Sequence, residues 1–449
     1  PSPHMMTLKD IAYRINAGGF KMVITDRDNM AKVDEVAAEC PHLQLRMVVD
    51  DNPLERLSSP WIGYQHELKY PAPVSTKLVA TAGRKVLATD PMLIYFTSGT
   101  TKDPKMVLHD YGHPLGQTVT AKFWHDLTDK DVHFTVSDTG WAKCGWGKIY
   151  GQWICGACIF VYDYRTKFLA TELLPLIEKY GITSFCAPPT IYRMLIIADL
   201  KKFSFSELRT CTSAGEPLNP EVIRIWKEGT GITIREGYGQ TETCCCLATM
   251  PGMEVRQGSM GKPVPGWHIQ LHDDEGNEVP QGEIGRIAIS LNPRPAGLIR
   301  EYLDNPEENA AMFVNGWYYT GDKARMDEDG YFWFVGRNDD VIKSSGYRIS
   351  PFEVESALLE HPAVKESAVV GSPDDLRGMI IKAFIVLHEG YQPSERLIKE
   401  IQNHVKSTTA PYKYPRAIEF VTELPKSFSG KIKRGELRDR ELKKYEENN

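Results

Sequence analysis

Short β-rich apolar runs alternate with helical-period segments along the first 190 residues. Thr7 can cap a helix whose apolar residues Leu8, Ile11 and Ile15 lie at helical spacing, and the run 20–25 then favours a strand. Further strands are predicted at 43–50, 92–96, 131–136, 158–163 and 182–189, and further helices at 30–39, 112–126 and 170–179. Strands separated by helices form parallel sheets. The pattern therefore predicts an α/β fold, with a large N-terminal domain of mixed parallel sheets flanked by helices.

The pattern changes twice in the second half of the chain. From about 258 to 335, short strands joined by turns predict a small β-rich subdomain. After Arg337 a compact α+β pattern begins, with a Pro-started helix at 351–360. We therefore predict a large domain at 1–338 and a small C-terminal α+β domain at 339–449.

Composition excludes some protein classes. The formal net charge of −6 argues against a nucleic-acid-binding protein. No apolar run approaches the about 20 residues that span a membrane. The nine cysteines favour reduced thiols and a cytoplasmic location. Cys155 and Cys158 form a CxxC pair, but they lie in an apolar run that predicts a buried strand, so a redox or zinc role is the less favoured alternative.

A polar segment, Thr97-Ser98-Gly99-Thr100-Thr101-Lys102-Asp103-Pro104-Lys105, follows the strand predicted at 92–96. Hydroxyl and backbone N–H donors in such a turn can surround phosphate oxygens, and Lys105 adds positive charge. The ending of a Walker A loop is absent. Because Ser, Thr and Gly also favour ordinary strand-to-helix loops, this segment alone leaves both interpretations open.

Four later segments carry similar chemistry. The stretch from Glu236 to Glu242 contains an aromatic ring, a hydroxyl and a carboxylate, which can stack on a base, contact a phosphate and bind Mg2+. Asp322 ends a predicted strand and is suited to accept hydrogen bonds from two ribose hydroxyls. Charged and glycine residues at 336–349 join the two domains, and Lys431 lies in a Ser-Gly-Lys turn. Taken singly, Asp322 is typical of a strand-end turn and Lys431 of a solvated surface lysine.

These five segments, in this order, resemble the acyl-adenylate-forming superfamily, which contains acyl-CoA synthetases, peptide-synthetase adenylation domains and luciferases. The resemblance extends from about residue 7 to the end of the chain. Within the superfamily, "SDTGWAKCGWGK", "REGYGQTET", "SSGYRI" and "TAPYKYPR" are most similar to the medium-chain acyl-CoA synthetase branch. The resemblance implies that the small C-terminal domain is mobile.

The resemblance also implies a nucleotide site. It assigns the β- and γ-phosphates of ATP to Thr97, Ser98, Gly99, Thr100, Thr101 and Lys105. It assigns the adenine to Gly215, Glu216, Pro217 and Tyr238, with Glu236 and Gly237 in the same ATP-binding set. It assigns the α-phosphate to Thr241, Mg2+ to Glu242, and the ribose to Asp322 with Arg337 nearby.

The implied reaction has two steps. A carboxylic acid and ATP give acyl-AMP and pyrophosphate, and acyl-AMP and CoA then give acyl-CoA and AMP. Lys431 would be the catalytic lysine of the first step, with Thr241 and Glu242, and Gly346 would line the CoA channel. A swing of the small domain about a hinge at Asp339 would remove Lys431 and admit CoA. The expected partners are therefore an acid, ATP, Mg2+ and CoA, with a homodimer as a further possibility.

Two other functions remain as alternatives: an adenylation domain that loads a carrier protein, and a truncated nucleotide- or acyl-binding protein without full activity. The truncated form is considered because only 96 residues precede Thr97, whereas members of the superfamily carry a much longer leader. We expect nucleotide binding to be retained, since its residues follow position 96. Such a chain could expose an apolar face, lean on oligomerisation or retain only part of the activity. Lys102 also departs from the glycine that most relatives carry there.

The preferred acid is predicted from Gly239. Acetate-using relatives carry a tryptophan at this place, just before Gln-Thr-Glu, which closes the acyl pocket. Loss of the indole would leave room for several methylenes, each contributing about 0.8 kcal/mol on burial. We therefore expect a medium-length or a branched or aromatic acid. Trp141 is either a wall of this pocket or a core aromatic residue.

Overall fold

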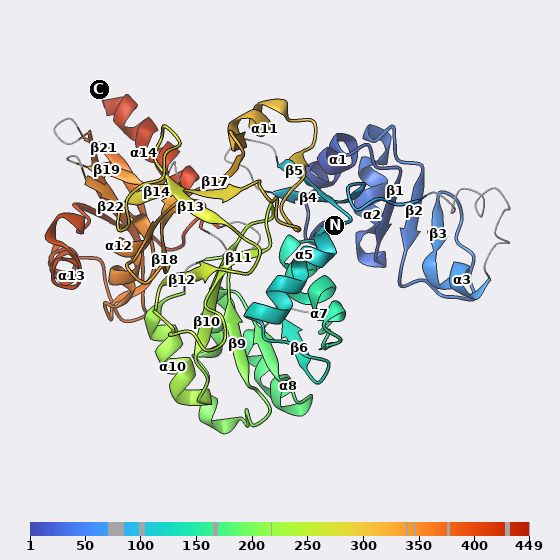
Figure 1. Ribbon diagram of the computed structural model, residues 1–449, viewed down its shortest axis with the longest axis horizontal. Coiled ribbons are helices and arrows are strands. Elements are labelled where there is room, and N and C mark those ends of the chain that lie inside the picture. The colour runs from blue at the N-terminus through green and yellow to red at the C-terminus, as the bar shows by residue number, and fades with distance from the viewer. Residues whose placement is uncertain are drawn as a thin grey trace. The chain divides into compact units, whose positions relative to one another are not determined.

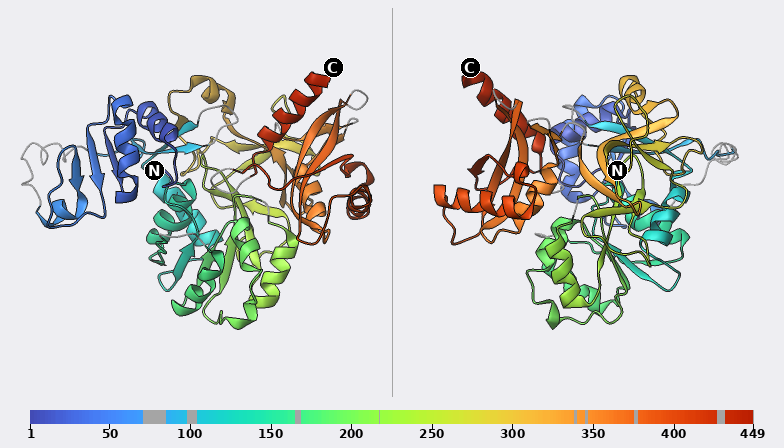
Figure 2. Two further views of the ribbon diagram at one scale, coloured as in Figure 1. Left: turned by 180° about the vertical axis from the view of Figure 1, so that it is seen from behind. Right: turned by 60° about the vertical axis from the view of Figure 1, so that its left-hand side comes forward.

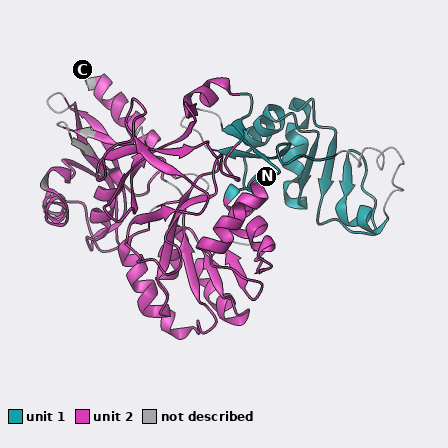
Figure 3. Ribbon diagram, in the orientation of Figure 1, with its two compact units in different colours: residues 1–112, 138–142, 300–304 teal, residues 113–137, 143–299, 305–449 magenta. Residues whose placement is uncertain are grey.

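The structure, a computed structural model, describes residues 1–70, 85–97, 104–164, 169–216, 218–337, 340–344, 347–374, 378–426 and 432–448. The chain divides into two compact units, which are coloured separately in Figure 3. Unit 1 comprises Pro1–Gly112, Asp138–Ala142 and Arg300–Asp304. Unit 2 comprises His113–Ser137, Lys143–Ile299 and Asn305–Asn449.

Unit 1 begins with the predicted alternation of helices and parallel strands. Its first elements are α1 (Leu8–Ala17), β1 (Met22–Thr25), α2 (Arg27–Val36), η1 (Ala37–Glu39), β2 (Leu45–Val48), β3 (Trp61–Gly63) and α3 (Tyr64–Lys69). Strands β1, β2 and β3 form a parallel sheet in that order. The predicted cap of α1 is confirmed, because the Thr7 hydroxyl accepts from the Asp10 amide in a capping box. Ala12, Ile15 and Val36 contribute to a small core between α1 and α2.

A second sheet of unit 1 has the order β15-β5-β4. Its strands are β4 (Pro91–Thr97), β5 (Lys105–Asp110) and β15 (Glu301–Tyr302). Because β4 and β5 pair antiparallel, the polar segment from 97 to 105 connects two strands of a hairpin. The alternative interpretation of this segment as a strand-to-helix loop is therefore wrong, because a strand and not a helix follows it.

Unit 2 contains a sheet of 12 strands, with the order β13-β14-β17-β18-β12-β11-β10-β9-β8-β6-β7 and β16 paired with β17 (Figure 1). The parallel strands are β6 (Val132–Thr135), β7 (Cys158–Ile159), β8 (Ser184–Cys186), β9 (Thr210–Ser213) and β10 (Ile234–Gly239). The antiparallel strands are β11 (Cys245–Ala248), β12 (Ser259–Pro263), β13 (Ile269–His272), β14 (Ile284–Ser290), β16 (Phe313–Val314), β17 (Trp317–Met326) and β18 (Phe332–Arg337). The β-rich segment predicted at 258–335 thus continues the parallel strands within one sheet.

Helices connect many of these strands. Between His113 and Asp340 they are α5 (His113–Val119), η2 (Thr120–Trp124), α6 (Ala142–Cys144), η3 (Gly145–Ile149), α7 (Tyr150–Ile154), η4 (Ala170–Glu172), α8 (Leu173–Lys179), α9 (Pro189–Leu195), η5 (Leu200–Lys202), α10 (Pro220–Thr230) and α11 (Pro306–Met312). η2 and η3 are π-helical. The main core lies where α8, α9 and α10 pack on the strands, around fully buried Phe185 and Trp226.

The CxxC region differs from the prediction of a buried strand. Residues 150–154 form helix α7, and only Cys158–Ile159 belong to a strand. Trp153 is 65% exposed, and Cys158 is exposed as well. A short apolar run fits a helix as well as a strand, because it is too short to show a clear period. No group of three metal-binding side chains occurs among the described residues.

The region after Asp340 has a core of its own. Its elements are β19 (Ile342–Ser344), β20 (Tyr347–Ile349), α12 (Pro351–Leu359), β21 (Val364–Asp374), β22 (Gly378–Leu387), α13 (Glu395–Thr408), η6 (Pro411–Lys413), β23 (Ala417–Phe420) and α14 (Arg434–Asn448). The core includes Val354, Ala383 and Ile401. Helix α14 lies beside β21, as Figures 1 and 2 show. The predicted boundary between 1–338 and 339–449 falls on residues outside the described ones and stays a prediction.

No helix in the described parts of the chain is both long and apolar enough to cross a membrane.

Candidate active site

Tyr238, Gln240 and Asp322 form a partly buried hydrogen-bonded cluster in unit 2. The Tyr238 hydroxyl donates to Asp322 Oδ2 at 2.6 Å, and Gln240 Nε2 donates to the same oxygen at 2.7 Å. Gln240 Nε2 also donates to the Thr320 carbonyl at 2.9 Å. Asp322 is only 7% exposed. Two residues that the resemblance assigns to adenine and ribose, Tyr238 and Asp322, therefore lie in direct contact.

Local strand geometry explains this contact. Tyr238 lies near the end of β10, where a register shift separates it from Gly239, and Asp322 lies within β17. Arg337 is the register partner of Asp322 on the neighbouring strand β18. Burial, followed by the charge of Asp322, raises the pKa of Tyr238 well above its usual value. Tyr238 is therefore a hydrogen-bond donor at neutral pH.

Glu236 is buried two residues before Tyr238 on β10. Its Oε1 accepts from the Leu218 amide at 2.9 Å, and its Oε2 accepts from the Gly258 amide at 3.1 Å. Burial raises the pKa of Glu236 to about 7, although these two backbone hydrogen bonds act in the opposite direction. The carboxylate therefore holds two loops in place, and its predicted contact with the nucleotide stays a prediction.

The loop after β9 carries the other residues assigned to adenine. Gly215 has φ +110°, a conformation that glycine tolerates and other residues rarely adopt. No described atom lies within 4 Å of the position that a Cβ on Gly215 would take. Glu216 forms an ion pair with Arg193 at 3.7 Å. Pro217 lies outside the described residues.

A short turn after β10 contains Thr241 and Glu242. The Gln240 amide donates to the Thr243 hydroxyl at 2.9 Å, and the Glu242 carbonyl accepts from the Ile299 amide at 2.6 Å. Glu242 is 8% exposed. A single carboxylate suits Mg2+, which usually binds one or two carboxylates together with water and substrate phosphates. Glu242 thus fits the predicted role in metal binding.

Thr97 and Lys105 belong to unit 1. They are register partners at the ends of β4 and β5, so they mark the two ends of the proposed phosphate segment. Lys105 Nζ lies 5.7 Å from the ring centroid of Tyr302 on β15. The predicted site residues Ser98, Gly99, Thr100, Thr101, Asp339, Gly346 and Lys431, and the atypical Lys102, lie outside the described residues.

The backbone packs closely around Gly239. A Cβ on Gly239 would lie 2.1 Å from the Cys244 carbonyl oxygen, because β10 and β11 approach closely at their register shift. A Cβ on Gly237 would lie 2.7 Å from both Cys245 Sγ and Trp124 Cε2. Backbone packing thus requires the absence of a side chain at Gly239, and its predicted place in the acyl pocket stays a prediction.

Trp141 is partly buried in unit 1, where its amide donates to the Asp138 carbonyl at 3.1 Å. Both interpretations of its ring, as a pocket wall or a core aromatic, stay open.

Two polar residues near the site were missed by the sequence analysis. Gln240 completes the cluster around Asp322, and its place beside the predicted Thr241 and Glu242 could have indicated this. Lys143 Nζ donates to the Ala214 carbonyl at 3.1 Å, next to the predicted Gly215. Nothing in the local sequence indicates this second contact, since 71 residues separate the two.

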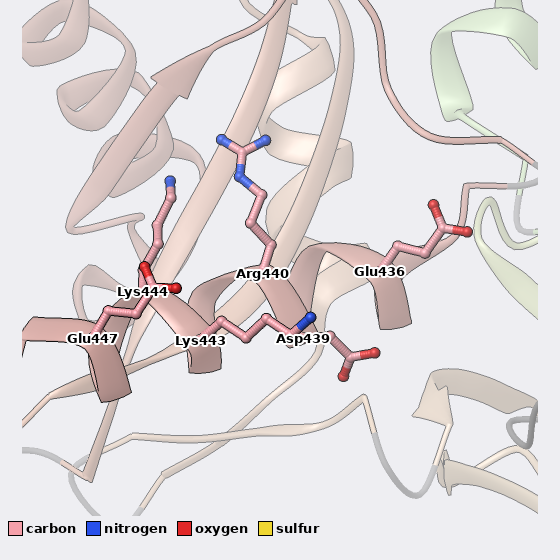
Figure 4. A pocket seen from close by; sticks show the side chains of 6 residues that line it. All are labelled: Glu436, Asp439, Arg440, Lys443, Lys444 and Glu447. Carbon is pink, nitrogen blue, oxygen red and sulfur yellow. The ribbon is translucent and has the colours of Figure 1, made fainter.

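A hollow of ≈460 Å³ on the surface of α14 does not coincide with these residues. Figure 4 shows that charged side chains of this one helix line it: Glu436, Asp439, Arg440, Lys443, Lys444 and Glu447. Arg440 and Lys444 both form ion pairs with Glu419. The hollow is therefore a charged surface feature of the C-terminal region.

Comparison with known proteins agrees with the motifs. The family model "AMP-binding enzyme" matches residues 1–303, and "AMP-binding enzyme C-terminal domain" matches residues 353–431. Acyl-coenzyme A synthetase ACSM3 of Rattus norvegicus is 49% identical over 445 residues, which cover 98% of this chain and 75% of that protein. Acyl-coenzyme A synthetase ACSM5 of Homo sapiens is 47% identical over 446 residues, with the same coverage.

Solved structures are similar too. The anthranilate CoA ligase AuaEII, in complex with anthranoyl-AMP, has a TM-score of 0.86 and 32% identity, and the alignment covers 98% of this chain and 81% of that one. A benzoate CoA ligase from Burkholderia xenovorans LB400 has a TM-score of 0.81 and 29% identity, covering 97% and 83%. These likenesses confirm the predicted α/β fold class.

One expectation is contradicted by the comparisons. The curated relatives named above are mitochondrial proteins, so the predicted cytoplasmic location is wrong. Reduced cysteines fit either compartment and could not have distinguished them. The matching families and the extent of identity agree on the chemistry: this chain belongs to the AMP-binding enzymes, as an AMP-forming acyl-CoA synthetase that uses ATP to join a carboxylic acid to CoA through an acyl-adenylate.

Proposed function

We propose that the enzyme activates a medium-chain, branched or aromatic carboxylic acid, and that the adenosine of ATP binds at Tyr238 and Asp322. The observation that carries the nucleotide part is the 2.6 Å hydrogen bond between these two side chains. It joins the two residues to which the resemblance assigns the adenine and the ribose. In this arrangement the Asp322 carboxylate is oriented by two donors, Tyr238 and Gln240, before a ribose arrives.

The remaining roles follow the residues' chemistry. Thr241 contacts the α-phosphate, and Glu242 binds Mg2+. The hairpin segment from Thr97 to Lys105, including Ser98, Gly99, Thr100 and Thr101, contacts the β- and γ-phosphates. Glu236 and Gly237 complete the adenine region with Gly215, Glu216 and Pro217, and Arg337 supports the ribose. These assignments are proposals.

In the first step, a carboxylate oxygen of the acid attacks the α-phosphorus, and the bond to the bridging oxygen of pyrophosphate breaks. Negative charge grows on the phosphate oxygens, so positive charge at fixed positions lowers the barrier. Lys431 supplies one such charge, and Mg2+ supplies another when bound. In the second step the CoA sulfur attacks the acyl carbonyl carbon, and AMP leaves. We propose Asp339 as the hinge of the small domain 339–449 and Gly346 as part of the CoA channel.

The class of acid is supported by likeness, and Gly239 and Trp141 are proposed to border the acyl pocket. The anthranilate and benzoate ligases, which act on aromatic acids, have a similar fold. The motifs of this chain most resemble the medium-chain branch. Both groups of substrate carry an extended apolar body, whose burial stabilises the complex by about 25 cal/mol per Å². We also propose that the enzyme forms a homodimer, that it binds no nucleic acid, and that it shares the mitochondrial location of its relatives.

The test is an assay of AMP release with acetate, butyrate, hexanoate, octanoate and benzoate, each with and without CoA. We expect AMP and acyl-CoA to form in equal amounts, and acetate to be the poorest substrate. Acid-dependent pyrophosphate exchange without acyl-CoA would favour the carrier-loading alternative. ATP binding without any turnover would favour the non-catalytic alternative. A preference for acetate would refute the proposed acid class.

A further inference from the structure

Lys143 reaches the loop that carries Gly215 from a distant part of the chain. It lies in the short helix α6, directly before the π-helix η3. Its Nζ donates to the carbonyl oxygen of Ala214 at 3.1 Å. Its side-chain stem packs near Gly147 of η3, since a Cβ on Gly147 would lie 3.6 Å from Lys143 Cγ. A lysine from one element therefore contacts the backbone of a loop 71 residues later.

The surroundings of this amine are buried. Burial lowers the pKa of Lys143, whereas the nearby Glu216 carboxylate acts in the opposite direction, and the thiols of Cys186 and Cys245 lie close by. Cys186 and Cys245 are fully buried. Placing an amine among such groups is costly, and a hydrogen bond to a carbonyl recovers part of the cost. A residue that served only to fill space could be apolar here.

The contact fixes one end of a short loop whose other end is also fixed. Ala214 is 2% exposed and directly follows β9, so its carbonyl needs a partner inside the protein. At the far end, the Leu218 amide donates to Glu236 at 2.9 Å. Gly215 and Glu216 lie between these two fixed points. The position of their backbone is thus set by Lys143 on one side and by Glu236 on the other.

We propose that Lys143 is a positioning residue for the purine of ATP. By holding the Ala214 carbonyl, it sets the backbone of Gly215 and Glu216 against which the base binds. The inference rests on the proposed adenine role of this loop. It predicts an effect on the nucleotide, because Lys143 contacts the loop backbone at Ala214.

The experiment compares Lys143→Met with Lys148→Met. Methionine keeps an unbranched apolar stem and removes the donor. Lys148 is the matched control, because it is a buried lysine on the adjoining η3, 8% exposed, whose pKa is also lowered by burial. For Lys143→Met we expect KM for ATP to rise about tenfold, the effect of one lost hydrogen bond, while KM for CoA and kcat change less than about twofold. Lys148→Met should leave KM for ATP within about twofold of wild type.

Binding of ATP by titration calorimetry gives a readout that needs no turnover. The Kd for ATP should rise by the same factor in Lys143→Met, even if the wild-type chain releases no AMP and the proposed reaction fails. An unchanged Kd for ATP, or equal losses for ATP, CoA and the acid, would overturn the proposal. Should Lys143→Met not fold, hydrogen exchange of the wild type decides: ATP must slow exchange in the peptide containing Ala214 to Glu216, and no slowing overturns the proposal.

Discussion

The hydroxyl of Tyr238 and the carboxylate of Asp322 are 2.6 Å apart, although β10 and β17 are not neighbours in the sheet. The strand order places β11, β12 and β18 between them, which makes four steps from strand to strand. In a flat sheet, four steps would separate the strands by about 19 Å. The sheet must therefore bend strongly between β10 and β17, and this bend creates the cluster that we assign to the nucleotide.

Tyr238→Phe tests this cluster. The change removes the Tyr238 hydroxyl. Of the two side chains that donate to Asp322 Oδ2 in this cluster, Gln240 is then the one that remains. Because hydrogen bonds to charged groups contribute about 1.5–3 kcal/mol, we expect the free energy of unfolding to fall by about 2 kcal/mol in urea titrations. KM for ATP should rise as well, since Asp322 loses part of its orientation. In the control Tyr162→Phe, the lost hydrogen bond to Glu172 is exposed, and the unfolding midpoint should hardly move. Equal effects of the two changes would contradict the assignment.

The sequence predicted those features that depend on neighbouring residues. Thr7 and Asp10 are close in the chain, and their cap was found where expected. The helix starting at Pro351, predicted at 351–360, was found nearly to the residue. By contrast, the contact of Lys143 with Ala214 depends on how distant elements pack, and no local pattern encodes it. The assignment of nucleotide roles to residues of the ordered motifs came from a resemblance, because spacing alone could not supply it, and it stays a prediction.

Gly239→Ala tests the close packing of the backbone around this glycine. The new Cβ would lie 2.1 Å from the Cys244 carbonyl oxygen, a backbone atom that cannot move without separating β10 from β11. Overpacking of this kind costs typically about 1–3 kcal/mol, and we expect the upper end in thermal denaturation. Gly435→Ala is the control, because the nearest atom to its Cβ would be Arg438 Nη2 at 3.9 Å, within helix α14. It should stabilise the protein by about 0.5–1 kcal/mol. A tolerated Gly239→Ala would contradict the close packing of β10 against β11 at this position.

Buried His133 makes the stability of unit 2 sensitive to acid. Its Nδ1 lies 2.9 Å from Ser184 Oγ, and its Nε2 lies 2.9 Å from the Gly147 carbonyl. Burial lowers the pKa of His133 to about 4, from 6.5, although the bond to Gly147 acts in the opposite direction. The unfolded chain therefore binds a proton at a higher pH than the native protein does. The stabilisation is complete above about pH 6.5 and is lost as pH falls toward 4, by about 3 kcal/mol in total.

The measurement is the unfolding free energy between pH 7 and pH 4.5. The slope with pH should be smaller in His133→Asn than in the wild type, even though the variant is less stable at pH 7. The control His42→Asn changes an exposed histidine and should keep the wild-type slope. A His133→Asn slope equal to that of the wild type would show that other groups cause the acid sensitivity.

Arg434 ties α14 to Glu355 of helix α12 and should thereby position Lys431. Its Nε donates to Glu355 Oε1 at 2.9 Å, its Nη2 donates to Oε2 at 2.5 Å, and the Val369 amide also donates to Oε1 at 2.7 Å. Glu355 is 5% exposed, so Arg434→Met leaves a buried carboxylate short of a cation. Such a loss costs about 3–5 kcal/mol, and the double change with Glu355→Gln should recover part of it.

The expected effect of Arg434→Met on catalysis follows from the closeness of Arg434 to Lys431 along the chain. Lys431 precedes Arg434 by three residues, so loosening α14 should slow acid-dependent pyrophosphate exchange while the Kd for ATP stays near the wild-type value. Arg440→Met on the same helix is the control: it removes an exposed ion pair with Glu419, which contributes little, so stability and exchange should both stay close to wild type. If Arg434→Met weakened ATP binding as much as it slowed exchange, Arg434 would act on the nucleotide site and not through Lys431.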